Sequence, residues 1–273
     1  MTFRDYLNKS YGAKKSGTVS SYLKAISIVD NIFNKVEAFD LNHKSICEIR
    51  DPFQIENIID FVAEEENKFR ANEPSIFDLG SPTQTSYPQK RFCTAAIRRL
   101  GEFIRQECDS EITEFVNASA QDGLQISENL LKKFQINHSS TEKERIVKHR
   151  IGQDLFRTVL LNIYDSKCCL TGLDVPDVLR ASHIIPWAEN EKNRLNPENG
   201  LCLSATYDAA FDKHLITFDE NYRLVLSPVI KEEYTSDAFK NYFLKLEGKA
   251  ITLPSKYKPS QQFLESHRSK LIV

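Results

Sequence analysis

The first half of the chain carries hydrophobic positions at helical spacing. Residues 16–36 place apolar side chains three and four positions apart, as one face of a helix requires. Residues 53–69 follow Asp51-Pro52, a combination typical of a helix start, and put Ile55, Ile58, Ile59 and Val62 on one side. A third helix is predicted over 90–107, after a loop rich in Pro, Ser and Thr over 72–89. These segments predict a helical domain.

The pattern changes in the second half, where short strand-like runs join the helices. Helices are predicted near 126–134 and over 144–161. Strand-like runs follow at 178–185, 214–219 and 222–228, and the last two are separated by a turn signal. Between them, 199–213 indicates a strand that leads into a short helix.

Small polar residues at 116–123 indicate a hinge between the two halves. We therefore predict three parts: a helical N-terminal domain over 1–118 with a DNA-recognition or sensing role, a linker and helix over 119–143, and a second domain over 144–273. The expected fold class is α+β.

Composition and charge narrow the class of protein. Hydrophobic residues make up 41% and charged residues 27% of 273 residues, values typical of globular proteins. No apolar run is long enough for a membrane span, and the N-terminus lacks a secretory signal. We therefore expect a cytoplasmic protein with reduced cysteines and no membrane partner. The net charge of −2 argues against a protein that only coats DNA, although clustered Lys and Arg could still bind it.

Residues 183–212 hold the candidate chemistry. His183 lies in an apolar run closed by Pro186, where a stiff backbone suits a general base. Asp208 and Asp212 are four residues apart, so on a helix they share a face, and a Mg²⁺ or Mn²⁺ ion would relieve their repulsion. Taken singly, each signal has a structural explanation: a core histidine, a solvated helix face, or a turn at Asn199-Gly200. Their order and spacing together favour a site.

That arrangement resembles the HNH nuclease family, in particular its branch of predicted restriction endonucleases. The matching stretches are RIGQDLFRTVLLNIYDSKCCLTG (150–172), ASHIIPWAE (181–189), RLNPENGLCLSATYDAAFDKHLITFD (194–219) and ITLPSKYKPSQQFLESHR (251–268). The resemblance implies a C-terminal ββα-metal (HNH) nuclease domain, in which a β-hairpin and a short helix grip one cation. The substrate implied is double-stranded DNA.

Carried over to this chain, the resemblance makes His183 the general base that takes a proton from the attacking water. Asn199 matches the residue that steadies the loop bearing that histidine. Asp208 and Asp212 match the metal positions on the helix. The metal would polarise the scissile phosphate and hold the charge that develops on the leaving oxygen.

Three positions depart from the common pattern. Ser182 stands where an Asp ligand is usual, so it is expected to bind metal through water or to cap the turn. Asp208 stands where His is usual, which favours a hard cation. His214 replaces a small residue, and is either a surface residue or a second imidazole near the phosphate. The cysteines near the site form no C-x-x-C pair, so a Cys₄ zinc site is not supported; Cys168, Cys169 and Cys202 are expected in the core.

Two basic groups are candidates for phosphate contact. The helix before the site carries Arg150, Gln153 and Arg157, which serve either phosphate binding or packing. In the third N-terminal helix Arg91, Arg98 and Arg105 are seven residues apart and form one stripe, although a solvated helix face would look the same.

Three functions are compatible with these residues. The first is a restriction endonuclease that cuts foreign DNA, as a homodimer if its sites are palindromic. The second is a nicking or nonspecific nuclease effector, activated by a signal that the N-terminal half senses. The third is a DNA-binding protein whose HNH site has decayed, for which Ser182 is the sole support.

Overall fold

The computed structural model describes residues 1–12, 16–41, 44–137 and 141–272. The chain divides into two compact units, Met1–Glu111 and Ile112–Val273, which are considered separately below. The division falls inside helix α5 (Phe92–Ala118). The segment 116–123, predicted as a hinge, forms the end of α5, a short link and the first residue of α6 (Gly123–Lys133). Residues 138–140 of the predicted linker lie outside the described residues.

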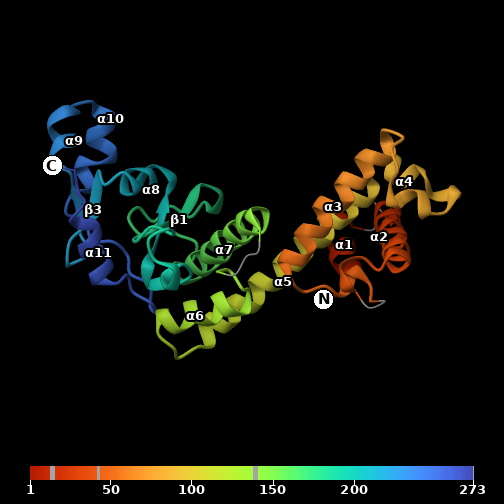
Figure 1. Cartoon of the computed structure of the whole chain (residues 1–273). Coiled ribbons are helices and arrows are strands. Elements are labelled where there is room, and N and C mark those ends of the chain that lie inside the picture. Colours follow the sequence, from red (N-terminus) through yellow and green to blue (C-terminus); the bar gives the residue numbers. More distant parts are fainter. Residues whose placement is uncertain (13–15, 42–43, 138–140, 273) are drawn as a thin grey trace. The chain divides into compact units, whose positions relative to one another are not determined.

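Unit 1 is helical (Figure 1). Its elements are α1 (Phe3–Tyr11), α2 (Ser16–Val36), α3 (Pro52–Arg70), α4 (Ser86–Gln89), the N-terminal part of α5, and the 3₁₀ turns η2 (Ala38–Asp40), η3 (Ile46–Glu48), η4 (Ile76–Leu79) and η5 (Pro82–Gln84). Asp51 caps α3 by accepting from the Phe53 backbone N–H, and Pro52 fills the first helical position. The apolar face predicted for α3, Ile55 to Val62, is buried.

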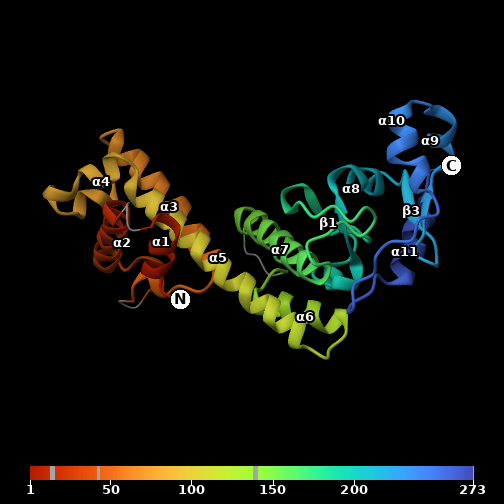
Figure 2. The ribbon, with the colours of Figure 1, turned by 180° about the vertical axis from the view of Figure 1, so that it is seen from behind.

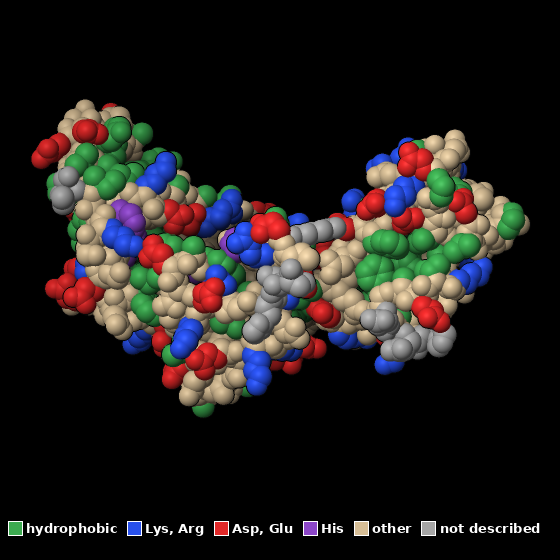
Figure 3. Space-filling model, in the orientation of Figure 1, with side chains coloured by type: hydrophobic (Ala, Val, Ile, Leu, Met, Phe, Trp, Pro, Cys, Tyr) green, Lys and Arg blue, Asp and Glu red, His purple; other side chains and the backbone are tan. Residues whose placement is uncertain are grey.

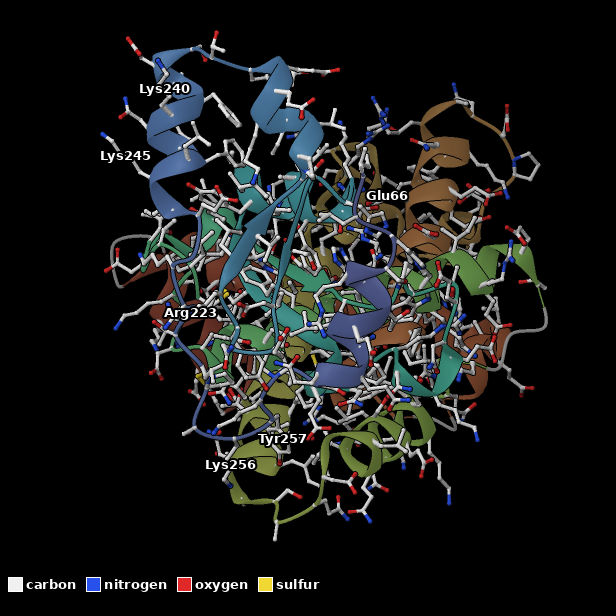
Figure 4. All side chains as sticks on the ribbon, turned by 90° about the vertical axis from the view of Figure 1, so that its left-hand side faces the viewer. Glu66, Arg223, Lys240, Lys245, Lys256 and Tyr257 are labelled. Carbon is white, nitrogen blue, oxygen red and sulfur yellow. The ribbon has the colours of Figure 1, made fainter. Side chains whose placement is uncertain are left out.

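A carboxylate also holds the start of α5. Glu66, on α3, is fully buried and labelled in Figure 4. It accepts from the backbone N–H groups of Cys93 and Thr94 at 3.0 and 3.3 Å, and from the Thr94 hydroxyl. These N–H groups belong to the first turn of α5 and have no partner within the helix, so Glu66 caps it from a neighbouring element. Burial raises the pKa of Glu66.

The structure differs from the predicted elements at three places in unit 1. The third helix begins at Phe92 rather than at residue 90, because Lys90 ends α4 and Arg91 has φ of 60°. Helix α1 was not predicted; Thr2 and Asp5 form its capping box. The loop over 72–89 contains two 3₁₀ turns and a helix of four residues.

Unit 2 combines helices with two small antiparallel sheets (Figures 1 and 2). After α6 come α7 (Glu142–Ile163), η6 (Pro176–Val178), β1 (Leu179–His183), η7 (Glu191–Asn193), η8 (Pro197–Asn199), β2 (Gly200–Ser204), α8 (Ala205–Asp212), β3 (Ile216–Phe218), β4 (Leu224–Leu226), α9 (Pro228–Glu233), α10 (Asp237–Tyr242), η9 (Leu244–Leu246) and α11 (Gln261–Arg268). Strand β1 pairs with β2, and β3 with β4. Strands β1, β3 and β4 lie within the strand-like runs predicted at 178–185, 214–219 and 222–228, and β2 and α8 lie within 199–213.

Helix α7 packs closely on strand β2. A Cβ atom at Gly200 would lie 2.5 Å from Leu160 Cδ1 and 2.6 Å from Phe156 Cζ, both on α7. Real Cβ contacts are longer than this. The helix can therefore approach the strand this closely only because residue 200 has no side chain. The absence of a side chain here sets the distance between the helix and the hairpin.

The C-terminal segment holds the end of α5. Lys256 donates from Nζ to the Asn117 carbonyl at 2.6 Å, and the Tyr257 hydroxyl donates to the Val116 carbonyl at 3.2 Å (Figure 4). These carbonyls belong to the last turn of the helix, where they lack partners within it. The cation also complements the negative end of the helix dipole.

No helix in the described part of the chain is both long and apolar enough to cross a membrane. On the face drawn in Figure 3, Lys and Arg side chains are interspersed with Asp and Glu in both units. The mixed signs agree with the near balance of 36 Lys and Arg against 38 Asp and Glu in the sequence.

Candidate functional site

Strands β1 and β2 and helix α8 carry the candidate residues. The two strands pair antiparallel from Leu179 opposite Ser204 to His183 opposite Gly200. Helix α8 follows β2 directly and packs on both strands. The chain therefore forms the hairpin-and-helix arrangement that the resemblance implied, with His183 at the end of one strand and the two aspartates on the helix.

His183 is fixed in one tautomer. Its Nε2 lies 2.9 Å from the carbonyl oxygen of Arg194. A carbonyl oxygen accepts and does not donate, so a neutral ring must carry its proton on Nε2. No described residue bonds Nδ1, which keeps its lone pair.

Aromatic neighbours hold the same ring. Phe156 stacks on His183 with a centroid distance of 3.7 Å and an interplanar angle of 16°, and Trp187 meets the ring edge-on at 5.7 Å. Burial among these groups lowers the pKa of His183 to about 4, although the Arg194 carbonyl acts in the opposite direction. The imidazole is therefore neutral at pH 7.

Asn199 ties down the loop that follows His183. It is almost fully buried, and its Oδ1 accepts from the Ile185 N–H at 2.8 Å. Its Nδ2 donates to the carbonyls of Ile185 and Asn193 at 3.1 and 3.2 Å. The side chain does not line the cleft described below, so Asn199 acts through the position of the loop.

Ser182 and the two aspartates form an oxygen-rich group. The Ser182 hydroxyl, which is buried, donates to Asp208 Oδ1 at 2.5 Å. Asp212 lies one helical turn after Asp208, and partial burial together with the charge of Asp208 raises its pKa. No described cationic side chain forms an ion pair with either carboxylate. Two carboxylates thus share one face without a positive partner.

A cleft of about 490 Å³ brings these groups together within unit 2. Ser182, His183, Asp208 and Asp212 all line it. The rest of the lining consists of residues from α7, β1, the loop after it, and the segment from α8 onward: Gln153, Asp154, Phe156, Arg157, Arg180, Ala181, Ile184, Pro186, Trp187, His214 and His267. The residues predicted as base and metal ligands therefore converge on one space.

The donor set fits a hard divalent cation that keeps part of its water shell. In the described part of the chain no group of three or more His, Cys, Asp or Glu side chains is placed to hold a metal ion. Mg²⁺, however, is commonly bound through one or two carboxylates, with water and substrate phosphate as further ligands. Asp208 and Asp212 match that requirement. Ser182 already donates its hydroxyl proton to Asp208, so it orients a carboxylate.

The three polar residues predicted on α7 lie differently toward the cleft. Arg150 is exposed and does not line it. Gln153 is exposed at its edge. Arg157 lines it, but its guanidinium donates to the carbonyls of Leu179 and Pro176, both at 2.7 Å, and so fixes the entry into β1.

In unit 1 the predicted arginine stripe is partly engaged in contacts within the unit. Arg105 forms an ion pair with Glu56, and Arg91 donates to Asn67 Oδ1 at 2.7 Å. Arg91 also precedes α5 and so does not belong to the same helix face. Arg98 is exposed and forms no hydrogen bond or ion pair with the described residues.

The sequence reasoning missed several groups that shape the site. The carbonyl of Arg194 could not be foreseen, because any residue supplies one. Phe156 and Trp187 were part of the quoted stretches but were assigned no role. His267, on α11, lines the cleft; its position in the closing stretch 251–268 was the available signal.

The cysteines near the site lie in the core. Cys168, Cys169 and Cys202 are buried, as expected, and Cys168 Sγ accepts from the Ser204 N–H at 3.3 Å. Burial raises the pKa of the Cys202 thiol to about 12 and that of Cys169 well above its usual value. The thiols of Cys169 and Cys202 are therefore protonated at neutral pH, and all three cysteines serve as packing groups.

Comparison with known proteins adds one match. No curated protein matches the chain. Residues 168–219, which contain β1, β2, α8 and β3, match a family model described as HNH endonuclease. The match covers His183, Asn199, Asp208 and Asp212, and it supports an HNH-type nuclease domain acting on DNA in unit 2 of this chain.

Proposed function

We propose that the chain is a metal-dependent DNA endonuclease that restricts foreign DNA, with His183 as general base. The observation that carries this proposal is the state of the His183 ring. Its Nε2 proton is committed to the Arg194 carbonyl, and its pKa is lowered to about 4. At neutral pH the ring therefore offers an unprotonated Nδ1 beside two carboxylates that have no cationic partner.

The residues of the cleft divide the work. Nδ1 of His183 takes a proton from the attacking water, and the Arg194 carbonyl stabilises the imidazolium that results. Phe156 and Trp187 keep the ring in place, while Asn199 fixes the loop from Ile185 to Asn193. Because these supports lie in packed elements, the base is held before substrate arrives.

Asp208 and Asp212 would hold the cation, most simply Mg²⁺ or Mn²⁺. When bound, the cation would supply charge stabilisation for the phosphate and for the leaving oxygen. Ser182 donates to Asp208 Oδ1, which fixes the rotamer of that carboxylate and leaves its other oxygen for the cation. Partial burial and the charge of Asp208 raise the pKa of Asp212, and a bound cation would act on that pKa in the opposite direction.

The choice of DNA site is assigned to unit 1, and a palindromic site would require a homodimer. The assignment to unit 1 follows from a division of labour, since a hairpin-and-helix cleft contacts mainly phosphates and offers little means of reading bases. The homodimer follows from the two-fold symmetry of a palindromic site. Digestion of modified and unmodified plasmid separates restriction from an effector nuclease. Discrete fragments whose ends share a sequence support restriction, whereas a smear supports a nonspecific effector.

The decisive experiment compares His183→Ala with wild type on supercoiled plasmid in Mg²⁺ or Mn²⁺. We expect the variant to lose cleavage by a factor of about 100 or more, because water then lacks its base. His149→Ala is the matched control: His149 meets Trp187 edge-on at 5.0 Å and does not line the cleft. Cleavage by His183→Ala at the wild-type rate would remove His183 as the base.

Asp208→Asn tests the metal site in the same assay. We expect it to shift the Mn²⁺ dependence of cleavage to higher concentration, because an amide is a weaker ligand than a carboxylate. Direct titration of Mn²⁺ by calorimetry provides a measure independent of turnover. An unchanged titration would exclude Asp208 as a ligand.

A further inference from the structure

His214, at the C-terminal end of helix α8, combines a strained backbone with a place in the cleft. Its φ is 52°, in the left-handed region that glycine adopts without strain. Its side chain lines the same cleft as Asp208 and Asp212. A residue with a side chain persists at such a position when the side chain offsets the strain or has a function.

The two nitrogens of the His214 ring are in different environments. Nδ1 is buried and has no hydrogen-bond partner. Nε2 is not buried and makes no hydrogen bond with the described residues. The ring lines the cleft, and Nε2 is its accessible nitrogen.

The neighbouring His267 cannot satisfy Nδ1. The two rings lie with centroids 4.5 Å apart. His267 Nε2 donates to the Phe211 carbonyl at 3.0 Å, so its Nδ1 is the acceptor for the Thr217 hydroxyl at 2.9 Å. Both nitrogens of His267 are therefore used, and Phe211 stacks on its other face at 3.7 Å.

This arrangement decides where the neutral His214 ring carries its proton. Orphaned buried N–H groups are rare in proteins, and buried acceptors without a donor are somewhat less rare. The proton therefore belongs on Nε2. Nε2 then presents an N–H donor to the cleft.

We propose that His214 binds the DNA substrate by donating Nε2–H to a non-bridging oxygen of a phosphate at the cleft. This rests on the proposed function, because the ligand is the phosphodiester that His183 and the metal would act on. The donor stands two residues after the helix that carries both aspartates, so it would meet a phosphate that enters the cleft near them. An N–H donor suits an anionic oxygen that the carboxylates themselves would repel.

The C-terminal tail fixes the donor. The His214 carbonyl accepts from the Ile272 N–H at 3.1 Å, and its own N–H donates to the Phe211 carbonyl at 2.9 Å. Lys270 bonds both carboxylate oxygens of Glu189, at 3.0 and 3.2 Å, which joins the tail to the loop after His183. The His267 ring packs against the His214 ring. Base, helix end and tail are thus connected around one cleft.

Two variants separate substrate binding from packing. His214→Gly removes the donor and relieves the backbone strain, so we expect unchanged or higher thermal stability with kcat/KM lower by roughly 10- to 100-fold. His214→Phe keeps a ring against His267 but has no donor, and we expect the same loss of kcat/KM. Ser166→Gly is the control, because Ser166 also has φ of 52° and lies outside the cleft; it should leave cleavage unchanged.

A binding measurement distinguishes failure of this inference from failure of the nuclease itself. Anisotropy of a short labelled duplex in EDTA compares the affinities of wild type, His214→Gly and His214→Phe, and we expect weaker binding by both variants. If wild type cuts DNA and His214→Phe cuts equally well, the ring only packs and the inference is overturned while the nuclease stands. If wild type does not cut, the nuclease proposal fails. Equal DNA affinities of wild type and the two variants, or no DNA binding by wild type, would then overturn the role of His214 as well.

Discussion

The carbonyl oxygen of Arg194 does for His183 what a carboxylate does for many catalytic histidines. It fixes the Nε2 tautomer and will stabilise a positive ring, without adding a charge to the cleft. The sequence identified the histidine but not this partner, which lies 11 residues farther on and acts through its backbone. Residue type reveals a candidate base; the atom that orients it depends on the path of the loop.

The same limit applies to Ser182 and Asn199. Asn199 was expected to steady the loop, and its three bonds to Ile185 and Asn193 do connect that loop, although its effect on catalysis stays a prediction. Ser182 was expected to bind metal through water or to cap the turn. In the structure its hydroxyl donates to Asp208 across 26 residues of sequence, a contact that local reasoning cannot foresee, and its role toward a metal stays a prediction.

His267 leads to a prediction about stability and pH. Burial lowers its pKa from 6.5 to about 4, whereas the unfolded chain keeps the ordinary value. As pH falls below 6.5, the unfolded state takes up the proton first, so stabilisation present above pH 6.5 is lost progressively down to pH 4. The loss amounts to up to about 3 kcal/mol from this residue.

Denaturant unfolding of wild type and His267→Gln between pH 8 and pH 4.5 measures that contribution. Glutamine keeps one donor and one acceptor for Phe211 and Thr217 but does not titrate in this range. The variant should therefore lose less stability on acidification than wild type. His183 adds a loss of the same sign in both proteins, since its pKa is also about 4. Parallel pH profiles would show that His267 does not titrate with folding.

At the level of elements, periodicity located the parts but not all their ends. Helices α2, α3, α6 and α7 coincide closely with the predicted segments, because each has a continuous apolar face. Strand β1 was predicted from an apolar run, and the hairpin β3–β4 was predicted from the turn signal between its two strands. Helices α1, α9 and α10 are short and were not predicted; the exposed aromatics Tyr234 and Tyr242 near α9 and α10 blur their apolar faces.

Gly200 provides the prediction that belongs to the packing of elements. Gly200→Ala would drive a methyl group into Phe156 and Leu160, so α7 and β2 must separate. We expect a loss of about 1–3 kcal/mol in the free energy of unfolding. Because Phe156 also stacks on His183, we expect slower cleavage in the same variant.

Gly17→Ala is the matched control for that substitution. A Cβ at Gly17, in helix α2, would meet no described atom within 4 Å. Alanine in a helix costs less conformational entropy than glycine, so this control should leave stability equal or slightly higher. Chemical denaturation gives the stability, and plasmid cleavage gives the rate. If Gly200→Ala has wild-type stability and a wild-type cleavage rate, helix α7 moves away from the added methyl group without displacing His183.

At the level of the whole molecule, the two compact units carry different kinds of information. Unit 2 contains the cleft and the segment that matches the HNH model. Unit 1 has its own hydrophobic core of buried side chains from α1 to α5. Its sequence contains no motif from which we predicted a ligand. For unit 2 the sequence therefore predicted a mechanism, because catalysis requires particular residue types at particular positions. For unit 1 it predicted only a fold class, because packing requires only hydrophobic residues at the right spacing.

The distribution of charge leads to the last prediction, which concerns DNA affinity. With a net charge of −2 and mixed signs on the surface, affinity must come from a few arginines without acidic partners. Arg150 on α7 and Arg98 on α5 are exposed and form no hydrogen bond or ion pair with the described residues, whereas Arg105 is paired with Glu56. We expect Arg150→Ala and Arg98→Ala each to weaken binding to all DNA sequences alike and to reduce the salt dependence of log K by about one counterion. Arg105→Ala should change that slope little, because its charge is already neutralised.

Anisotropy in EDTA over a range of salt concentrations measures DNA binding by all three variants. A slope altered by Arg150→Ala but not by Arg98→Ala would confine the phosphate contacts to unit 2 and leave unit 1 with sensing rather than DNA recognition.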